Sequence, residues 1–474
     1  MRVNREFGLL ARLWKYVFRE VDASSLAVFR ICFGGLLLFE SINYGLFLCL
    51  DCMYRSSVVL FKYQHFEWVT LLPGNGLEWV LALMGISAMG VMLGWYYRLC
   101  SVLLLLCFSY HFLLDQALYL NHFYMVMLIS AIMIFLPANR IWSVDASRAK
   151  SRGGENTHST IPNWALVWMA FQLEIILIYA GLVKLNYDWL NLEPLRLWMQ
   201  VSAADEATIF QWLTHDPGIA LASYGVILLH IVGAPLLLFK KTRLAVFLVY
   251  CVFHIMNTFV FNIGIFPWLT LAATLLLFDP DWPRQAIAWL NSKGWCLQGR
   301  HLAQGVVVAQ VPKQNAWQIV IVAFMGIWLL LQALIPLRHY TMPGNVAWNE
   351  AGHQFSWRMK LRDKRGTVLF RVVDSTNREW RVKPDRYLNQ KQLYRIACIP
   401  GLVWQFAQML DTEYSLRTGA KVAVYADTSC SLNTRKPVPL VNQQIDLSII
   451  PRDHPTSAWL YSLTEPLPRP LFHW

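Results

Sequence analysis

Long apolar runs constrain the fold of this chain more than any other feature of its sequence. The run at 164–189 contains about twenty mostly apolar residues, which is enough for one helix to cross a bilayer. Similar runs lie on both sides of it, and only 15% of the 474 residues are charged. A soluble domain would carry about 25% charged residues. The sequence therefore predicts a multipass integral membrane protein.

The apolar runs predict an all-α membrane bundle of about nine transmembrane helices within residues 1–337. The fourth run stops at Pro137, and a tight turn around Arg98 joins the second run to the third. The predicted spans are 26–50, 77–95, 99–114, 122–136, 164–189, 217–239, 244–261, 265–278 and 317–337.

The polar residues 338–474 predict a second domain, small, β-rich and of the α+β class. Stretches 355–361 and 367–373 read as two strands of a hairpin that turns at Lys364-Arg365-Gly366. Residues 388–410 read as helical with a break at Pro400, and 421–425 and 438–445 as further strands.

The distribution of Lys and Arg predicts the orientation of the bundle. The net charge is +12, from 41 basic and 29 acidic residues, but no nucleic-acid-binding motif is present, so we expect no nucleic-acid partner. Basic residues are most frequent in segments that nine spans would place on one side: 1–22, the turn at Arg98, 138–163, 240–243 and 279–315. This asymmetry favours a cytoplasmic N-terminus and an extracytoplasmic C-terminal domain.

Two ionisable residues near the end of the fifth predicted span are candidate functional residues. Lys184 precedes Asp188 by four residues, so a continuous helix would place both on one face. One interpretation is an anchor at the membrane surface, in which Lys184 reaches the headgroups or pairs with Asp188. The other is a desolvated lysine whose lowered pKa makes a neutral amine available as a base. The residues alone leave both open.

Two more polar pairs belong to the same predicted outer side of the membrane. Asn121 and His122 open the fourth span, and His254 and Asn257 lie three residues apart in the seventh. The structural interpretation is helix capping and hydrogen bonding between helices. The functional interpretation is a set of groups that orient a substrate carbonyl or enolate. We interpret His230 as structural.

The cysteines and the metal-binding residue types give weaker signals. Cys49 and Cys52 form one CxxC motif, and Cys398 and Cys430 would pair only if their domain is exported. No motif with metal-ligand spacing occurs, so we expect no metal.

A series of short motifs resembles the vitamin K-dependent γ-glutamyl carboxylase family and its bacterial relatives, which share the HTTM (horizontally transferred transmembrane) domain. The resemblance extends over nearly the whole chain. The motifs are Asp22-x-x-x-Leu26-Ala-x-Phe-Arg30-Ile, Asn121-His122-x-Tyr124, Trp142-Ser-Val-Asp145, Tyr179-Ala-Gly-x-x-Lys184-Leu-x-x-Asp188-Trp, Phe253-His254-x-Met-Asn257, Trp282-Pro-Arg284, Phe355-Ser-Trp357-x-Met359 and Ser431-Leu-Asn433-x-Arg435.

The resemblance implies an activity, its cofactors and roles for individual residues. In the animal enzyme, oxygenation of reduced vitamin K to its epoxide provides the strong base that removes a γ-proton from peptidyl glutamate, and the carbanion captures CO2. The resemblance implies that Lys184 corresponds to the lysine that deprotonates the hydroquinone. It implies that Asn121 and His122 correspond to a pair associated with binding of the glutamate or its carbanion. His254, Asn257, Asp188 and Trp357 are then candidate substrate- or cofactor-binding residues. The partners would be the lipid bilayer, a quinone and a glutamate-containing exported protein or peptide.

The sequence is compatible with three classes of function. The first is a carboxy-lyase with vitamin K epoxidase activity, using O2 and CO2 as co-substrates. The second is a quinone- or lipid-binding HTTM protein that only forms the epoxide or has no enzymatic activity. The third is a structural or transport protein in which the polar residues hold helices together. In a bacterium the location would be the cytoplasmic membrane.

Overall fold

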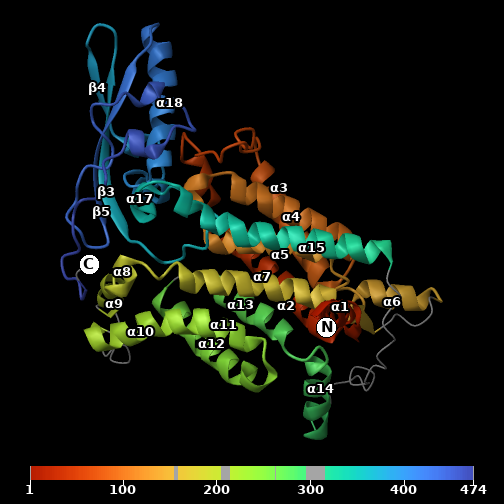
Figure 1. Ribbon diagram of the computed structural model, residues 1–474. Helices are drawn as coiled ribbons and strands as arrows, with labels where there is room; N and C mark the ends of the chain where they lie inside the picture. Colours follow the sequence, from red (N-terminus) through yellow and green to blue (C-terminus); the bar gives the residue numbers. More distant parts are fainter. Residues whose placement is uncertain (1, 154–158, 204–213, 262, 295–314, 473–474) are drawn as a thin grey trace.

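The computed structural model of the protein describes residues 2–153, 159–203, 214–261, 263–294 and 315–472 (Figure 1). A helical bundle forms the larger part, and a smaller domain that contains a β-sheet projects from one end of it. Part of the basic segment 279–315 lies outside the described residues.

Apolar helices of the described residues match the predicted spans one by one. Six are long and apolar enough to cross a membrane: Ser24–Phe47, Gly76–Leu93, Trp164–Leu182, Asp216–Leu237, Lys240–Val260 and Ala316–Thr341. Three shorter apolar helices, Tyr97–Leu113, Asn121–Phe135 and Phe266–Leu277, correspond to the other three runs. Nine spans therefore stay a prediction, and so does the domain boundary at residue 337.

The bundle is built from helices α1 to α15 in chain order. They are α1 (Arg2–Phe18), α2 (Ser24–Ile42), α3 (Gly76–Leu93), α4 (Tyr97–Leu113), α5 (Asn121–Phe135), α6 (Val144–Ser151), α7 (Trp164–Leu182), α8 (Tyr187–Leu190), α9 (Leu195–Ala203), α10 (Asp216–Leu228), α11 (Ala234–Leu237), α12 (Lys240–Val260), α13 (Phe266–Thr274), α14 (Trp282–Ser292) and α15 (Ala316–Leu334). Strands β1 (Glu20–Asp22) and β2 (Thr160–Pro162) pair antiparallel beside α1 and α7.

Two glycines allow helices of the bundle to approach each other closely. A Cβ atom on Gly34 of α2 would come within 2.7 Å of the backbone of α3 at Ala88 and Met92. A Cβ on Gly181 of α7 would lie 2.8 Å from the Cβ of His230. Real Cβ atoms do not come so close, so a side chain at either position would push the helices apart. The second contact brings a histidine against the end of α7.

The smaller domain is built on a three-stranded antiparallel sheet in the order β4-β3-β5. The strands are β3 (Lys364–Val373), β4 (Glu379–Val382) and β5 (Ala423–Leu432), and α17 (Gln390–Ile396) and α18 (Pro400–Thr418) pack beside them (Figure 1). The predicted helix break is confirmed, since Pro400 is the first residue of α18. The strands expected at 367–373 and 421–425 lie within or overlap β3 and β5.

Three features of this domain were predicted wrongly. The residues expected to form a turn at Lys364 instead begin β3, and the hairpin turns after Val373, where Asp374 accepts backbone N–H groups of Thr376 and Arg378. The stretch 355–361 is irregular, with left-handed φ at Phe355, Trp357 and Lys360, so it cannot pair as a strand. The stretch expected as a strand at 438–445 forms only isolated bridges.

Disulfides and buried polar contacts hold the domain together and fix it to the bundle. Cys398 is bonded to Cys430 on β5, and Cys49 to Cys52 in the loop after α2. Between the two parts, the buried carboxylate of Asp115 accepts a hydrogen bond of 2.7 Å from Gln392 Nε2. Burial raises the pKa of Asp115 to about 6. The domain is therefore docked on the bundle through buried polar groups as well as apolar contacts.

Candidate active site

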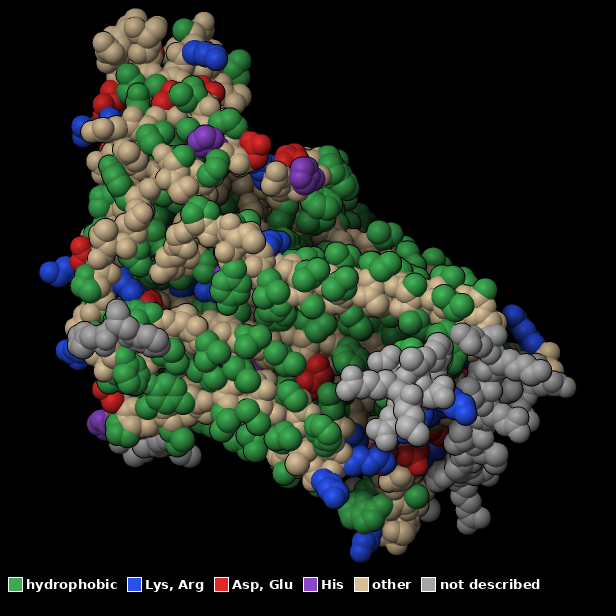
Figure 2. Space-filling view, in the orientation of Figure 1, with side chains coloured by type: hydrophobic (Ala, Val, Ile, Leu, Met, Phe, Trp, Pro, Cys, Tyr) green, Lys and Arg blue, Asp and Glu red, His purple; other side chains and the backbone are tan. Residues whose placement is uncertain are grey.

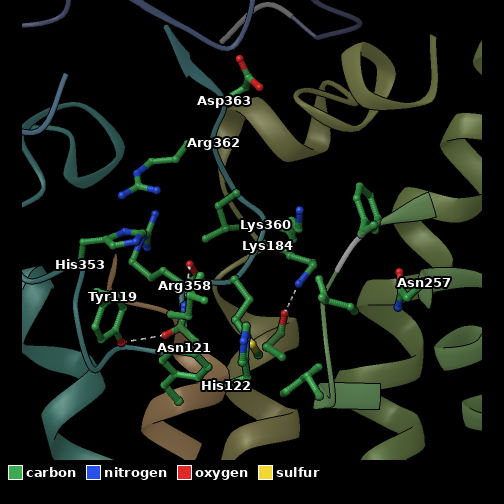
Figure 3. A pocket seen from close by; sticks show the side chains of 18 of the residues that line it. Tyr119, Asn121, His122, Lys184, Asn257, His353, Arg358, Lys360, Arg362 and Asp363 are labelled. Carbon is green, nitrogen blue, oxygen red and sulfur yellow. Dashed lines mark hydrogen bonds between the residues drawn. The ribbon is translucent and has the colours of Figure 1, made fainter. Parts of the chain in front are cut away.

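A cavity of about 1650 Å³ lies where the smaller domain meets the helices (Figure 3). Its lining comes from two sources. The ends of α5, α7, α10 and α12 supply the part within the bundle, and the irregular segment that precedes β3 supplies the part within the domain. This arrangement brings together residues that are more than 200 positions apart in the sequence.

Lys184 lines this cavity just beyond the end of α7. Its side chain is 6% exposed, and Nζ donates a hydrogen bond of 2.7 Å to the carbonyl of Ala180. Nζ also lies 5.1 Å from the centre of the Trp189 ring. Among the described residues no carboxylate forms an ion pair with Lys184. Burial lowers the pKa of Lys184 to about 7, because water that would stabilise the ammonium is excluded.

The expectation that Lys184 and Asp188 share one helical face is wrong, and Asp188 pairs with another residue. Helix α7 ends at Leu182, and α8 begins after Asn186, whose side chain caps it by accepting from Trp189 N. The two residues are therefore not on one continuous helix. The Asp188 carboxylate instead accepts two hydrogen bonds of 2.7 Å from Arg435 and one of 2.7 Å from Asn433. It does not line the cavity.

Asn121 and His122 lie in the first turn of α5 and line the cavity (Figure 3). Tyr119 O–H donates to Asn121 Oδ1 over 3.0 Å, and the Asn121 amide Nδ2 donates to the carbonyl of Arg358 over 3.4 Å. The Tyr119 oxygen accepts in turn from Phe355 N over 2.7 Å. These contacts fix the Asn121 amide against the smaller domain. His122 packs beside Phe123 and Phe266.

Two histidines from other helices line the same cavity. His254 of α12 is 1% exposed, and within the described structure neither of its ring nitrogens has a hydrogen-bond partner. Asn257 lines the cavity three residues further along α12. His230, which the sequence placed among structural residues, lines it as well, on a π-helical turn (Leu229–Gly233) between α10 and α11. Its Nδ1 lies 2.8 Å from the carbonyl of Val226, which requires a proton on Nδ1.

A cationic wall, formed by Arg358, Lys360, Arg362 and Lys364, lines the side of the cavity that belongs to the smaller domain. Arg362 and Lys364 both donate to the buried carboxylate of Glu350, with Arg362 Nε at 2.7 Å and Lys364 Nζ at 2.8 Å. In the described structure no carboxylate pairs with Arg358 or Lys360. Burial lowers the pKa of the Arg358 guanidinium to about 10. The wall thus keeps positive charge available for an anion.

Comparison with known families agrees with this geometry. A family model for the HTTM domain matches residues 18–282, more than half of the chain. The chain belongs to the HTTM family. A second model, described as the lumenal domain of vitamin K-dependent gamma-carboxylase, matches residues 317–465. The chain is thus a vitamin K-dependent carboxylase-like multipass membrane protein with an extracytoplasmic C-terminal domain, which confirms the resemblance. No solved structure matches the chain.

The cavity of this HTTM protein has an apolar limb between α10 and α12. Leu221, Val249 and Val252 line it and are also exposed on the outer surface of the bundle. That surface is covered with hydrophobic side chains, as Figure 2 shows for the helices below the C-terminal domain. The lining of one cavity therefore includes both Lys184 and side chains that reach the apolar outer surface of the bundle. A lipophilic quinone of the kind that the family implies fits such a lining.

Trp357 supports the wall rather than lining the cavity. It is fully buried, and its ring centre lies 4.9 Å from that of Tyr124 on α5. Its indole is therefore not placed to contact a ligand in the cavity. Within the described part of the chain, no group of three or more His, Cys, Asp or Glu side chains is arranged to hold a metal ion.

Proposed function

We propose that this protein is a membrane γ-carboxylase that couples oxygenation of a reduced quinone to carboxylation of a glutamate side chain in an exported polypeptide. One observation carries the proposal. A single cavity joins an apolar limb, a cationic wall and a buried lysine that has no counterion among the described residues. A lipophilic and an acidic substrate could thus reach one amine from different sides.

Lys184 would act as the base that starts the reaction. Its amine is buried, its pKa is lowered to about 7, and it is held by the carbonyl of Ala180, so a large fraction is neutral near pH 7. The Nζ lone pair would accept the proton of a hydroquinone hydroxyl group. When bound, the quinol would supply, through its oxygenation to the epoxide, a base strong enough to remove the γ-proton of glutamate.

The groups opposite Lys184 would hold the acidic substrate. Arg358 and Lys360 would bind the glutamate carboxylate, since charge-assisted hydrogen bonds are the stronger ones and no carboxylate of the described residues pairs with either cation. Asn121, fixed by Tyr119, would orient the side chain or donate to charge that develops on it. His122 and His254 line the same space and would contribute further hydrogen bonds. Exclusion of bulk water by the apolar lining would protect a carbanion from protonation.

The test is an assay of both half-reactions on the purified protein in lipid nanodiscs. We expect epoxide formation from vitamin K hydroquinone and O2, together with incorporation of 14CO2 into a glutamate-containing peptide. Lys184→Ala should lower both rates at least about 10²-fold, the usual minimum for loss of a general base. Lys241→Ala, at an exposed lysine on the first turn of α12, is the matched control.

The outcomes separate the function classes. Epoxide formation without incorporation of CO2 would support the epoxidase-only alternative, and absence of both activities would reject an enzymatic role in this reaction. Full activity in the Lys184→Ala variant would remove Lys184 from the mechanism.

A further inference from the structure

A second cavity, of about 670 Å³, lies in the HTTM domain at the end of the bundle away from the C-terminal domain. It is formed where the turn before α4, the loop after α5 and helix α6 come together. In Figure 1 helix α6 is at the opposite end of the molecule from β3, β4 and β5. Because the C-terminal domain is extracytoplasmic, this cavity opens at the cytoplasmic surface of the membrane.

The one carboxylate of the lining is fully occupied by local structure. Asp145 accepts hydrogen bonds from the backbone N–H groups of Tyr96 and Tyr97, at 2.9 and 3.0 Å. It also accepts one of 2.9 Å from Asn139 Nδ2. Asp145 therefore stabilises the free N–H groups at the start of α4 and connects that helix to α6. Its charge is directed at the helix end and not at the arginines of the cavity.

Two of the lining residues, Arg98 and Arg140, carry guanidinium groups whose charges repel each other. Arg98 is on the first turn of α4, and Arg140 follows α5. Within the described residues neither guanidinium forms an ion pair or a hydrogen bond. The Arg98 guanidinium lies 5.7 Å from the centre of the Tyr97 ring. Arg148 of α6 does not line the cavity, but its guanidinium lies 5.3 Å from the ring of the lining residue Tyr96. The cavity thus presents two guanidinium groups that no carboxylate of the described residues pairs, which makes it a candidate site for an anion.

The surroundings of the cavity are those of the membrane surface. Leu99 lines it and is 58% exposed, and Tyr96 lines it and is 56% exposed. Exposed aromatic residues next to arginines are typical of the headgroup region of a bilayer. The lining thus combines cations for a headgroup with an apolar edge that faces acyl chains.

We propose that this cavity binds the headgroup of an anionic phospholipid of the cytoplasmic leaflet. The guanidinium groups of Arg98 and Arg140 would donate to the phosphate oxygens, and Leu99 would pack against the first part of an acyl chain. Basic pockets between transmembrane helices on the cytoplasmic side are suited to such lipids. The site is independent of the proposed carboxylase activity, since it is at the other end of the bundle.

Thermal unfolding of the detergent-purified full chain tests the proposal. Short-chain phosphatidylglycerol should raise the Tm more than phosphatidylcholine with the same acyl chains. Arg98→Gln/Arg140→Gln should weaken the apparent affinity for phosphatidylglycerol about tenfold or more, whereas the control Lys241→Gln, at an exposed lysine of the same membrane side, should keep it. Phosphatidylglycerol that copurifies with the wild type, but not with the double variant, would support the proposal independently of the Tm.

Three results would overturn it. Equal effects of the two lipids would show that the phosphate charge is not recognised, and an undiminished response of the double variant would show that the arginines are not the site. The same Tm increase with inorganic phosphate alone would identify a site for free phosphate instead of a lipid. If the double variant cannot be purified, the single Arg140→Gln variant at an exposed loop residue provides the same readout, with a reduced response expected and a full response contradicting the proposal.

Discussion

Lys184 and Asp188, two buried charged residues that follow α7, have opposite surroundings although they are only four positions apart. Asp188 is held by Arg435 and Asn433 through three hydrogen bonds of 2.7 Å. Lys184 contacts a backbone carbonyl and an aromatic ring, without a carboxylate among the described residues. Both side chains are less than 10% exposed. Burial alone therefore does not distinguish a structural charge from a chemically available one, whereas the partner does.

The physical reason lies in what happens to each charge once water is removed. The Asp188 carboxylate has its cation in Arg435, which follows β5, so the pair connects the bundle to the smaller domain. A buried ammonium without an anion is unfavourable, so Lys184 moves toward its neutral form. The first arrangement joins the two domains, and the second would supply the proposed base between them.

The largest effect should come from breaking the structural pair. Arg435→Met leaves the Asp188 carboxylate buried without its cation, which typically costs about 3–5 kcal/mol. We expect a large decrease in the Tm of the purified protein. Lys184→Met removes an unpaired buried amine instead and should raise the Tm while it abolishes epoxide formation.

The double variant Asp188→Leu/Arg435→Met provides the control for this comparison. It removes both charges, so it should recover part of the stability that Arg435→Met loses. An Arg435→Met protein as stable as the wild type would contradict the assignment of Asp188 to the fold.

Two features could be predicted from the sequence: the positions of the helices, and the location of the candidate residues on one side of the membrane. Both depend on the local distribution of apolar and basic residues. Apolar runs define helices directly, and the distribution of Lys and Arg assigned Lys184, His122 and His254 to one membrane side. The structure places all three in the lining of one cavity. Their chemical roles and the inside position of the N-terminus stay predictions.

The features that sequence reasoning missed depend on contacts distant in the chain or on irregular backbone. Asp188 and Arg435 are 247 residues apart in the chain. The helix break near Asn186, which separates Asp188 from Lys184, has no clear signal in the sequence, where the segment reads as a continuous helix. The cationic wall follows residues with left-handed φ, which hydrophobic periodicity does not reveal. His230 gave one signal, an ionisable residue within an apolar span, which could have marked it as functional.

The next effect, of intermediate size, concerns the protonation of the unpaired lysine. A base acts in its deprotonated form, and burial lowers the pKa of Lys184 to about 7. The rate of epoxide formation should therefore rise with pH through about 7 and fall about tenfold for each pH unit below it. The pH profile should be measured with the Tm at each pH, so that unfolding is not mistaken for titration. A rate that does not change between about pH 5.5 and 8 would show that Lys184 is not the titrating base.

The smallest effect on activity should come from the cationic wall. This wall also contains one lysine that pairs with a carboxylate and one that, among the described residues, does not. Lys364 is paired with Glu350, whereas Lys360 reaches into the cavity above the rings of Trp198 and Phe261, at 5.3 and 4.5 Å from their centres. Lys360→Gln should raise the KM for a glutamate-containing peptide about tenfold, the value of one hydrogen bond to a charged group, and should change kcat less. Arg378→Gln, at an exposed residue of the turn before β4, is the matched control for loss of one positive charge. An equal rise in KM in both variants would mean that the peptide responds to the net charge of the domain, and Lys360 would then have no specific part in binding it.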